Sequence, residues 1–309
     1  MMPGIVRRRR MLVDRTAIVA SVLLLTSAIG PAAGAQDLNG AVSTGDLDAV
    51  REALPPGTGA DPGSLVRPLY FAARDGHSAI VAYLLEEGAP ADAATSFGSA
   101  LQIAARGNHV PVLTLLLDAG ADPDLMAGEE SRTALHDAAE RGALDAARLL
   151  LERGAEVNAR TKMDHPPIHL AARRERAEMV AYLAEAGASP RAVDAIAATE
   201  LDAADAEAGR IAAEECRGCH AMEAGAPPPG RFPAPSLAGI VGREKAVQAD
   251  FPYTAALSGL DGSWTQEEID RFIADPTGVA PGTAMGHAGI QDRAKRIAII
   301  AHLMSLQAE

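Results

Sequence analysis

The chain has 309 residues, enough for two domains of ordinary size, and 48% of them are hydrophobic while only 3% are aromatic. Its formal net charge is −13, which argues against nucleic acid and anionic membrane surfaces as partners, because both attract basic proteins. Abundant alanine with few aromatic residues predicts packed small helices, and therefore an all-α fold.

Residues 1–35 have the features of a secretory signal peptide. Five arginines precede an uncharged apolar stretch, Ala17 to Ile29, which is shorter than the about 20 residues that a membrane span needs. Small residues follow at Ala33-Gly34-Ala35, so we expect cleavage after Ala35, a periplasmic mature chain and no membrane span after cleavage. Removing five arginines and one aspartate changes the net charge from −13 to −17. An uncleaved membrane anchor is the alternative.

One pattern returns four times between residues 36 and 195. An Ala-Ala pair begins at residues 72, 104, 138 and 171, and a Gly-Ala pair begins at 88, 120, 154 and 187, so both markers share spacings of 32, 34 and 33. Each unit predicts a small-residue helix, a tight turn and a leucine-rich second helix. The turns fall at Gly76, Asn108 and Gly142, which tolerate a left-handed backbone, whereas the fourth unit has Glu175 there.

These units resemble the ankyrin repeat. The family's opening motif is clearest in Thr133-Ala-Leu-His-Asp-Ala-Ala and Pro167-Ile-His-Leu-Ala-Ala, and Gly154-Ala-Glu-Val-Asn-Ala matches its closing segment. The resemblance predicts an ankyrin-repeat domain over 36–195, with about five repeats of which the first is atypical. It implies that His136 and His169 stabilise turns and that the domain binds a protein. A purely structural spacer is the alternative. An alanine- and acid-rich linker, 196–208, follows.

The two cysteines form the motif Cys216-Arg-Gly-Cys219-His220, the pattern that attaches c-type haem. Two thiols at this spacing can add to the two vinyl groups of one haem, and the next histidine can then ligate the iron. The alternatives are a redox pair, a disulfide or half of a zinc site. Zinc would require a second Cys/His cluster, which the sequence lacks, and a thioredoxin-like pair would follow a strand, whereas residues 208–215 favour a helix.

Three methionines downstream of the motif are candidates for the second axial ligand. Met222 is too close to His220 to reach the other face of the haem, and Met304 is expected to lie in the core of a last helix. Met285 lies in a Pro/Gly loop that can approach a ring closely, so it is the predicted ligand. A thioether ligand raises the reduction potential, as electron transfer favours. His287 is an alternative ligand.

Residues 209–309 resemble the class I cytochromes c of the mitochondrial and c2 kind. The haem motif is followed, in the family's order, by the segments beginning at Pro235, Phe251, Trp264 and Asp275, and then by the Met285 loop and a last helix. The resemblance implies that Pro235 accepts the His220 ring N–H and that Arg243, Tyr253 and Trp264 hold a haem propionate. Thr283 would support the methionine loop.

The predicted function is a periplasmic single-electron carrier with one haem c, bound through Cys216 and Cys219 and ligated by His220 and Met285. The ankyrin repeats would dock it to a redox partner, either a dehydrogenase that donates electrons or an oxidase that accepts them. We favour an electron-transfer protein over a catalyst with its own substrate. The alternatives are a haem peroxidase, which requires a displaceable ligand, and a haem-based sensor or adaptor.

Overall fold

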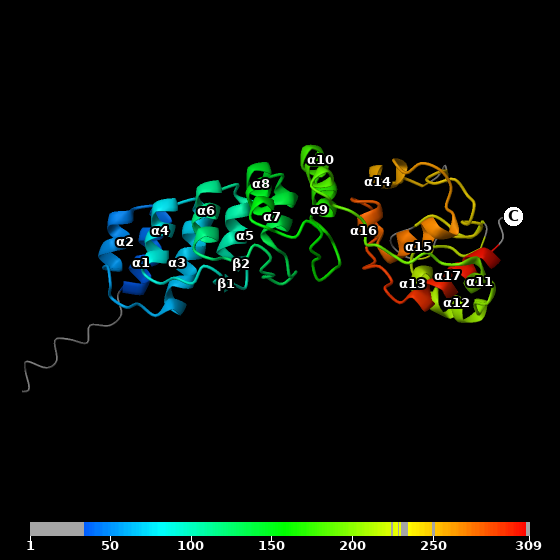
Figure 1. Ribbon diagram of the computed structural model, residues 1–309, viewed down its shortest axis with the longest axis horizontal. Coiled ribbons are helices and arrows are strands. Elements are labelled where there is room, and N and C mark those ends of the chain that lie inside the picture. Colours follow the sequence, from blue (N-terminus) through cyan, green and yellow to red (C-terminus); the bar gives the residue numbers. More distant parts are fainter. Residues whose placement is uncertain (1–33, 224, 228, 230–233, 249–250, 307–309) are drawn as a thin grey trace, which may run out of the picture.

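The computed structural model describes residues 34–223, 225–227, 229, 234–248 and 251–306. The predicted signal peptide lies outside the described residues, except for Gly34 and Ala35 at the start of the first helix. Helices account for nearly all regular structure, and the two strands, β1 (Ala94–Thr95) and β2 (Gly98–Ser99), form one short antiparallel hairpin (Figure 1). The all-α prediction is confirmed.

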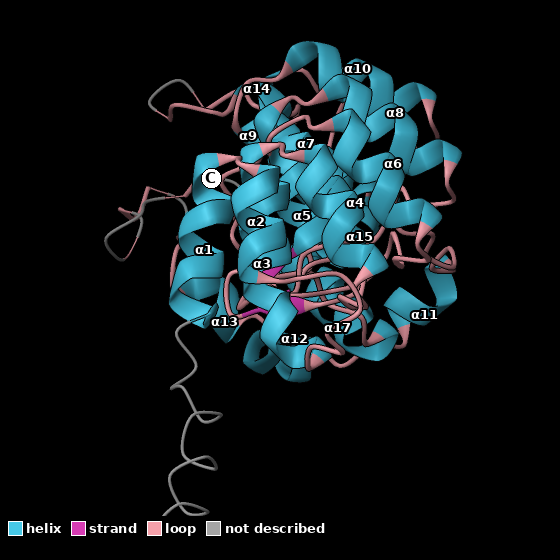
Figure 2. Ribbon diagram, turned by 90° about the vertical axis from the view of Figure 1, so that its left-hand side faces the viewer, coloured by secondary structure: helices cyan, strands magenta, loops and turns pink. Residues whose placement is uncertain are grey.

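Five successive helix pairs make up the first part of the chain. In Figure 2 the first helices of the pairs lie in one layer and the second helices in another, and each pair is turned relative to the one before. The pairs are α1 (Gly34–Thr44) with α2 (Leu47–Ala53), α3 (Pro62–Asp75) with α4 (Ser78–Glu86), α5 (Ala100–Arg106) with α6 (Val110–Asp118), α7 (Ala134–Arg141) with α8 (Leu144–Glu152), and α9 (Pro167–Arg173) with α10 (Ala177–Glu185).

The turn inside each of the last four pairs has a left-handed residue at the predicted position. The φ angles are 76° at Gly76, 55° at Asn108, 75° at Gly142 and 57° at Glu175. Glutamate therefore adopts the conformation that glycine or asparagine supplies in the other repeats, at some cost in backbone strain. The last pair, α9 with α10, consequently keeps the geometry of its neighbours in spite of its departure from the pattern.

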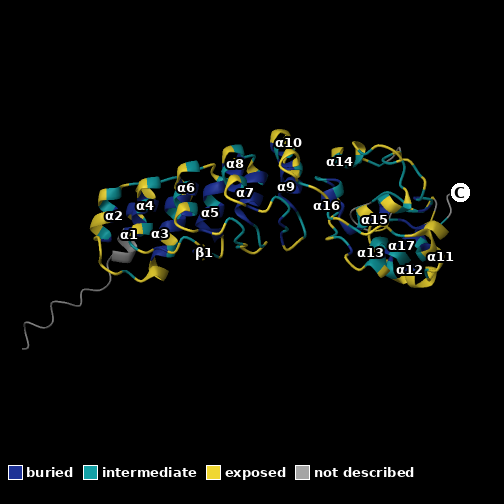
Figure 3. Ribbon diagram, viewed as in Figure 1, coloured by how far each residue is buried: buried dark blue, intermediate teal, exposed yellow. Residues whose placement is uncertain are grey.

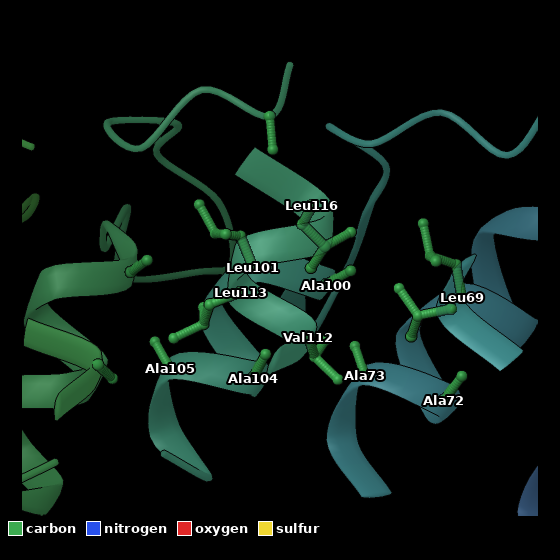
Figure 4. Packing of buried hydrophobic residues seen from close by; sticks show 14 of the residues in the cluster. Leu69, Ala72, Ala73, Ala100, Leu101, Ala104, Ala105, Val112, Leu113 and Leu116 are labelled. Carbon is green, nitrogen blue, oxygen red and sulfur yellow. The ribbon is translucent and has the colours of Figure 1, made fainter. Parts of the chain in front are cut away.

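Alanines on the first helices and leucines on the second helices share one continuous core, which extends from Leu38 to Leu183. Figure 4 shows Ala72 and Ala73 of α3, Ala104 and Ala105 of α5, and Val112, Leu113 and Leu116 of α6 within this cluster. Small side chains on one helix allow the next repeat to approach closely, so the large side chains fill the space between layers.

Hydrogen bonds from one equivalent position link the repeats of α5 and α7 to the repeats that follow them. At the start of α7, His136 Nδ1 accepts from the Thr133 backbone N–H at 3.1 Å, and His136 Nε2 lies 3.0 Å from the carbonyl oxygen of His165 in the last repeat. Gln102, at the equivalent position of α5, donates to the Arg132 carbonyl oxygen before α7. The predicted turn-stabilising role of His136 is thus confirmed.

The second part of the chain has its own core, formed around α17 (Arg293–Ser305) and including Ile299, Ile300 and Leu303. Its other helices are short: α11 (Ala198–Asp202), α12 (Ala206–Ala212), α13 (Glu214–Arg217), α14 (Ala255–Ser258), α15 (Gln266–Ala274) and α16 (Pro276–Val279). Leu201, in the segment predicted as a linker, is buried in this second core. That segment is therefore packed against the C-terminal domain.

Helices α12 and α17 cross in close contact in the second domain. At Gly209 the two helices approach so closely that an added Cβ would overlap the Ala298 carbonyl oxygen. Near this crossing, buried Arg296 donates to Asp270 at 2.6 Å and to the carbonyl oxygens of Ile290 and Gln291, which joins α17, α15 and the segment after Met285. Within the described part of the chain, no helix is long and apolar enough to cross a membrane.

Candidate haem site

The Cys-x-x-Cys-His motif begins in α13 and continues in the turn that follows it. The backbone N–H groups of Cys219 and His220 both donate to the Cys216 carbonyl oxygen, at 3.2 and 2.9 Å. Cys216 is half-buried and Cys219 is exposed, and both are free thiols. Burial, with a smaller contribution from Glu215, raises the pKa of Cys216 to about 11. A redox-active cysteine has a lowered pKa, so this site does not have the electrostatics of a thioredoxin-like pair.

His220 is held in one tautomer by the segment that follows the motif. The Ala234 N–H donates to the Cys219 carbonyl oxygen at 3.0 Å and the Leu237 N–H to that of Ala221 at 2.8 Å, so the two segments lie parallel. This pairing brings the Pro235 carbonyl oxygen to 2.6 Å from His220 Nδ1. A carbonyl only accepts, so Nδ1 carries the proton and Nε2 keeps its lone pair. Burial lowers the pKa of His220, which keeps the ring neutral, as a metal ligand must be.

The Met285 loop is fixed at its base by Thr283. The Thr283 side chain is buried, and its Oγ1 accepts the Met285 backbone N–H at 3.2 Å. Met285 itself is half-buried. The two other candidate methionines lie elsewhere: Met222 is buried in the second core, and Met304 is 40% exposed on α17. The prediction that Met304 fills the core is wrong, because its position on α17 faces solvent.

A polar cluster brings the Met285 loop to the cysteine motif. His287, two residues after Met285, has Nε2 at 3.4 Å from the carboxylate of Glu215, the residue before Cys216. Lys295 of α17 forms an ion pair with the other oxygen of Glu215 at 2.5 Å, and lowers the pKa of that carboxyl. His287 Nδ1 accepts the Gly289 N–H at 3.0 Å. Both ring nitrogens of His287 are therefore occupied by protein groups, which disfavours His287 as the alternative iron ligand.

Arg243, Tyr253 and Trp264 form a third group. Arg243 and Trp264 are joined through their backbones, since the Trp264 N–H donates to the Arg243 carbonyl oxygen at 2.8 Å. The Arg243 guanidinium donates to the carbonyl oxygen of Ser236 at 2.6 Å, directly beside Pro235. Burial lowers the pKa of Arg243, and Tyr253 is near enough to offset part of this effect. Hydrogen bonds thus link His220 to Pro235 and Arg243 to the adjoining Ser236, and the Met285 loop is linked through His287 to Glu215 beside Cys216.

The chemistry of these residues fits a haem with a buried propionate. Arg243 is a half-buried cation, and the described part of the chain supplies it with no carboxylate partner. Next to Tyr253, the buried hydroxyl of Thr254 has no hydrogen-bond partner among the described residues. Unsatisfied donors and an uncompensated cation cost free energy unless an anion joins them. By contrast, the described residues contain no group of three or more His, Cys, Asp or Glu side chains suited to a bare metal ion.

An ankyrin-repeat stack followed by a helical domain with a covalent haem site defines the class of protein, and the comparisons agree. Residues 38–127 and residues 125–194 each match the family described as ankyrin repeats (3 copies). The C-terminal part is similar to a cytochrome c homolog of Bradyrhizobium diazoefficiens, with 38% identity over 133 residues, covering 41% of this chain and 71% of the relative. The chain therefore belongs to the ankyrin-repeat family through its first part and to the cytochrome c family through its second.

Two further relatives show how the second part compares. Cytochrome c2 iso-2 of Magnetospirillum fulvum is 41% identical over 93 residues, which cover 29% of this chain and 91% of the relative. The cytochrome c-type cyt cy of Rhodobacter capsulatus is 33% identical over 103 residues, which cover 33% and 49%. These homologues imply that the chain binds haem c covalently and carries electrons.

Sequence reasoning missed the contribution of Glu215 and Lys295, which tie the Met285 loop to α13 and α17. A glutamate directly before the first cysteine was visible in the sequence. Its partner lies 80 residues further along the chain, so the pair is apparent only in the folded chain.

Proposed function

We propose that this protein is a periplasmic single-electron carrier with one haem c. Cys216 and Cys219 would hold the haem through two thioether bonds. Each thiol would add across one vinyl double bond, with its sulfur on one carbon and its hydrogen on the other, so nothing leaves and no oxidant is consumed. His220 Nε2 and the Met285 sulfur would ligate the iron. Haem held in this way supplies an iron that alternates between the ferric and ferrous states.

The observation that carries this proposal is the hydrogen bond of 2.6 Å between His220 Nδ1 and the Pro235 carbonyl oxygen. Such a bond from the second ring nitrogen orients a ligating imidazole and increases its basicity. Arg243 and Thr254 would bind a propionate and offset its burial. With protein ligands on both sides the iron would have no vacant position, which favours electron transfer over peroxidase chemistry.

Export to the periplasm is supported by the arginine-rich, apolar start of the chain, with cleavage expected after Ala35. We further infer that the repeats dock a redox partner. Three large apolar side chains are exposed in the loops between repeats, Phe97 by 80%, Met126 by 51% and Met163 by 51%. Large exposed apolar side chains are typical contacts in protein-binding surfaces.

The test of the haem ligation is a spectrum of the mature chain produced with haem-maturation machinery. We expect a weak far-red sulfur-to-iron band in the ferric parent, its loss in Met285→Ala and its retention in Met304→Ala, which removes a methionine from the surface. A parent protein without this band, and with high-spin iron, would overturn the proposed ligation. Peroxidase or ligand-sensing chemistry would then become the leading interpretation.

A further inference from the structure

The segment that leads to Met285 packs against the last ankyrin repeat. It begins at Asp275, passes through α16 and reaches Thr283, and α16 lies beside α9 in Figure 1. The residues from Pro166 to Ala171 at the start of α9 are all buried, as are residues 274–278 (Figure 3). A terminal repeat usually requires a polar outer face, so this burial shows that the second domain covers the end of the stack.

An ion pair joins the base of this segment to the repeat. Arg160, in the loop before α9, donates two hydrogen bonds to the Asp275 carboxylate, at 2.7 and 2.5 Å. The Asp275 side chain is fully buried and also accepts the backbone N–H groups of Arg191 at 2.6 Å and Gly278 at 3.0 Å. Burial raises the pKa of Asp275, but these hydrogen bonds, with that from Arg160 first among them, outweigh it and lower the pKa overall. The carboxylate therefore stays charged and paired.

A second contact lies three residues before Met285. The Gly282 backbone N–H donates to His169 Nδ1 of α9 at 3.1 Å. Gly282 has a φ of 90°, and a Cβ there would lie 3.1 Å from the Cβ of Ala172. Glycine is required here because of the positive φ and because a side chain would crowd Ala172. Burial, with smaller effects of neighbouring positive groups, lowers the pKa of His169 to about 3, so its ring is neutral and Nδ1 can accept.

The sequence of the last repeat explains why Nδ1 of His169 can accept a hydrogen bond from the second domain. In the repeat before it, that of α7 and α8, the Thr133 N–H donates to the ring nitrogen Nδ1 of His136. Thirty-three residues later the equivalent residue is Pro166, which has no N–H to donate. Gln102 and His136 each bond to the backbone of the next repeat, whereas His169 bonds to the backbone of Gly282. The second domain thus occupies the place of a further repeat.

We propose that the last ankyrin repeat positions the axial methionine, with His169 and Arg160 as positioning residues that hold the segment 275–283 and so keep the Met285 sulfur on the iron. This inference rests on the proposed His220/Met285 ligation. It makes the repeat stack part of the electron-transfer site, because whatever loosens the last repeat also loosens the ligand.

The experiment measures how fast imidazole binds to the ferric full-length protein, since an added ligand must wait for the methionine to leave. We expect His169→Ala to bind imidazole about fivefold to tenfold faster than the parent, the factor given by one hydrogen bond of ordinary strength. Arg160→Gln leaves Asp275 without its charged partner, so we expect this variant to bind imidazole at least about tenfold faster than the parent. The reduction potential should fall in both variants, because loss of the thioether disfavours ferrous iron.

Two matched variants distinguish positioning from general stability. Gln102→Ala removes the equivalent side chain two repeats earlier, whose hydrogen bond ends on Arg132 and not on the last repeat, so it should destabilise the stack and leave imidazole binding unchanged. His169→Asn retains an acceptor near the place of Nδ1 and should restore most of the parent rate. Equal rates and potentials for parent, His169→Ala and Arg160→Gln would overturn the positioning role alone. A parent without the far-red band would instead overturn the ligation on which it depends.

Discussion

The two domains of this protein are stabilised in different ways. Of the twelve largest fully buried side chains, ten lie in the ankyrin stack and only two, Ile299 and Ile300, lie in the haem domain. In the stack, first helices pack against first helices of the neighbouring repeats, and second helices against second helices. The haem domain instead contains a long stretch after the cysteine motif in which α14 is the only helix among the described residues.

This difference indicates what each domain requires in order to fold. A repeat stack buries its apolar faces on its own neighbours, so its stability is a sum over repeats and their interfaces. The haem domain has too few large buried side chains to form a comparable core. The domain has irregular segments, an Arg243 cation that pairs with no carboxylate among the described residues, and a buried Thr254 hydroxyl. These features are consistent with a core that covalent haem completes.

The largest effect should come from removing the haem attachment. In Cys216→Ala/Cys219→Ala we expect the haem domain to lose its stable structure, while the repeats keep theirs. Hydrogen exchange read by mass spectrometry should then rise by at least about a hundredfold in α12, α15 and α17, a loss of about 3 kcal/mol or more. Protection in α3 to α8 should be almost unchanged.

Met285→Ala serves as the control for this experiment, because it alters the haem ligation without removing the covalent bonds. We expect it to retain most of the protection in α17. Full protection of the haem domain in the cysteine double variant would show that its polypeptide forms a sufficient core alone, which would remove the contrast between the domains.

The same substitution in two helices should have opposite effects in the two domains. Gly209→Ala places a Cβ against the backbone of α17, so we expect it to destabilise the haem domain by about 3 kcal/mol or more. Gly40→Ala, in α1, meets no atom within 4 Å and should stabilise the stack by about 0.5 to 1 kcal/mol. Thermal unfolding followed by haem absorbance reports on the haem domain, and unfolding followed by circular dichroism reports on both domains. An unchanged stability of the haem domain in Gly209→Ala would mean that α12 and α17 can move apart at little cost in free energy.

Much of the repeat domain could be predicted from the sequence because its signals are local and periodic. The Ala-Ala and Gly-Ala pairs located four of the five helix pairs, and the turn residues of these four carry positive φ where the pattern requires it. Even Glu175 adopts the left-handed turn, since the helices on either side of it fix the backbone. Local sequence did not reveal that the equivalent positions Gln102, His136 and His169 would each reach into the next module.

The haem site was predictable as a motif but not as an arrangement. Cys216, Cys219 and His220 are close together in the sequence, so their chemistry could be read directly. The contact of His169 with Gly282 spans 113 residues, as does the hydrogen bond from Thr277 to the Asp164 carbonyl oxygen. Such pairs depend on how two domains pack, and no periodic pattern within either domain encodes them.

A pH effect on stability should be measurable in the repeats. Burial lowers the pKa of His136 to about 4, whereas a histidine in the unfolded chain has a pKa of about 6.5. The unfolded chain therefore binds the proton more tightly, and stability is greatest above about pH 7 and falls as the pH decreases towards about 4. The difference corresponds to about 3 kcal/mol.

His136→Gln isolates this contribution, because Gln102 already occupies the equivalent position in α5. Urea unfolding of both proteins at about pH 7.5 and about pH 4 should show a loss for the parent that exceeds that of the variant by about 3 kcal/mol. Equal losses would mean that His136 is not a neutral buried ring in the folded state.

The smallest effect on stability should come from Phe97, whose side chain lies at the turn between β1 and β2 and is 80% exposed. Phe97→Ser should change the free energy of unfolding by no more than about 0.5 kcal/mol. If the repeats dock a redox partner, the ferric variant should be reduced about tenfold more slowly by respiring membranes of the source organism. Met304→Ser, which alters an exposed side chain of the haem domain, should be reduced at the parent rate. If the stack acts only as a spacer, the parent, Phe97→Ser and Met304→Ser proteins would all be reduced at the same rate. The haem domain would then dock the partner, and the repeats would serve as a rigid support.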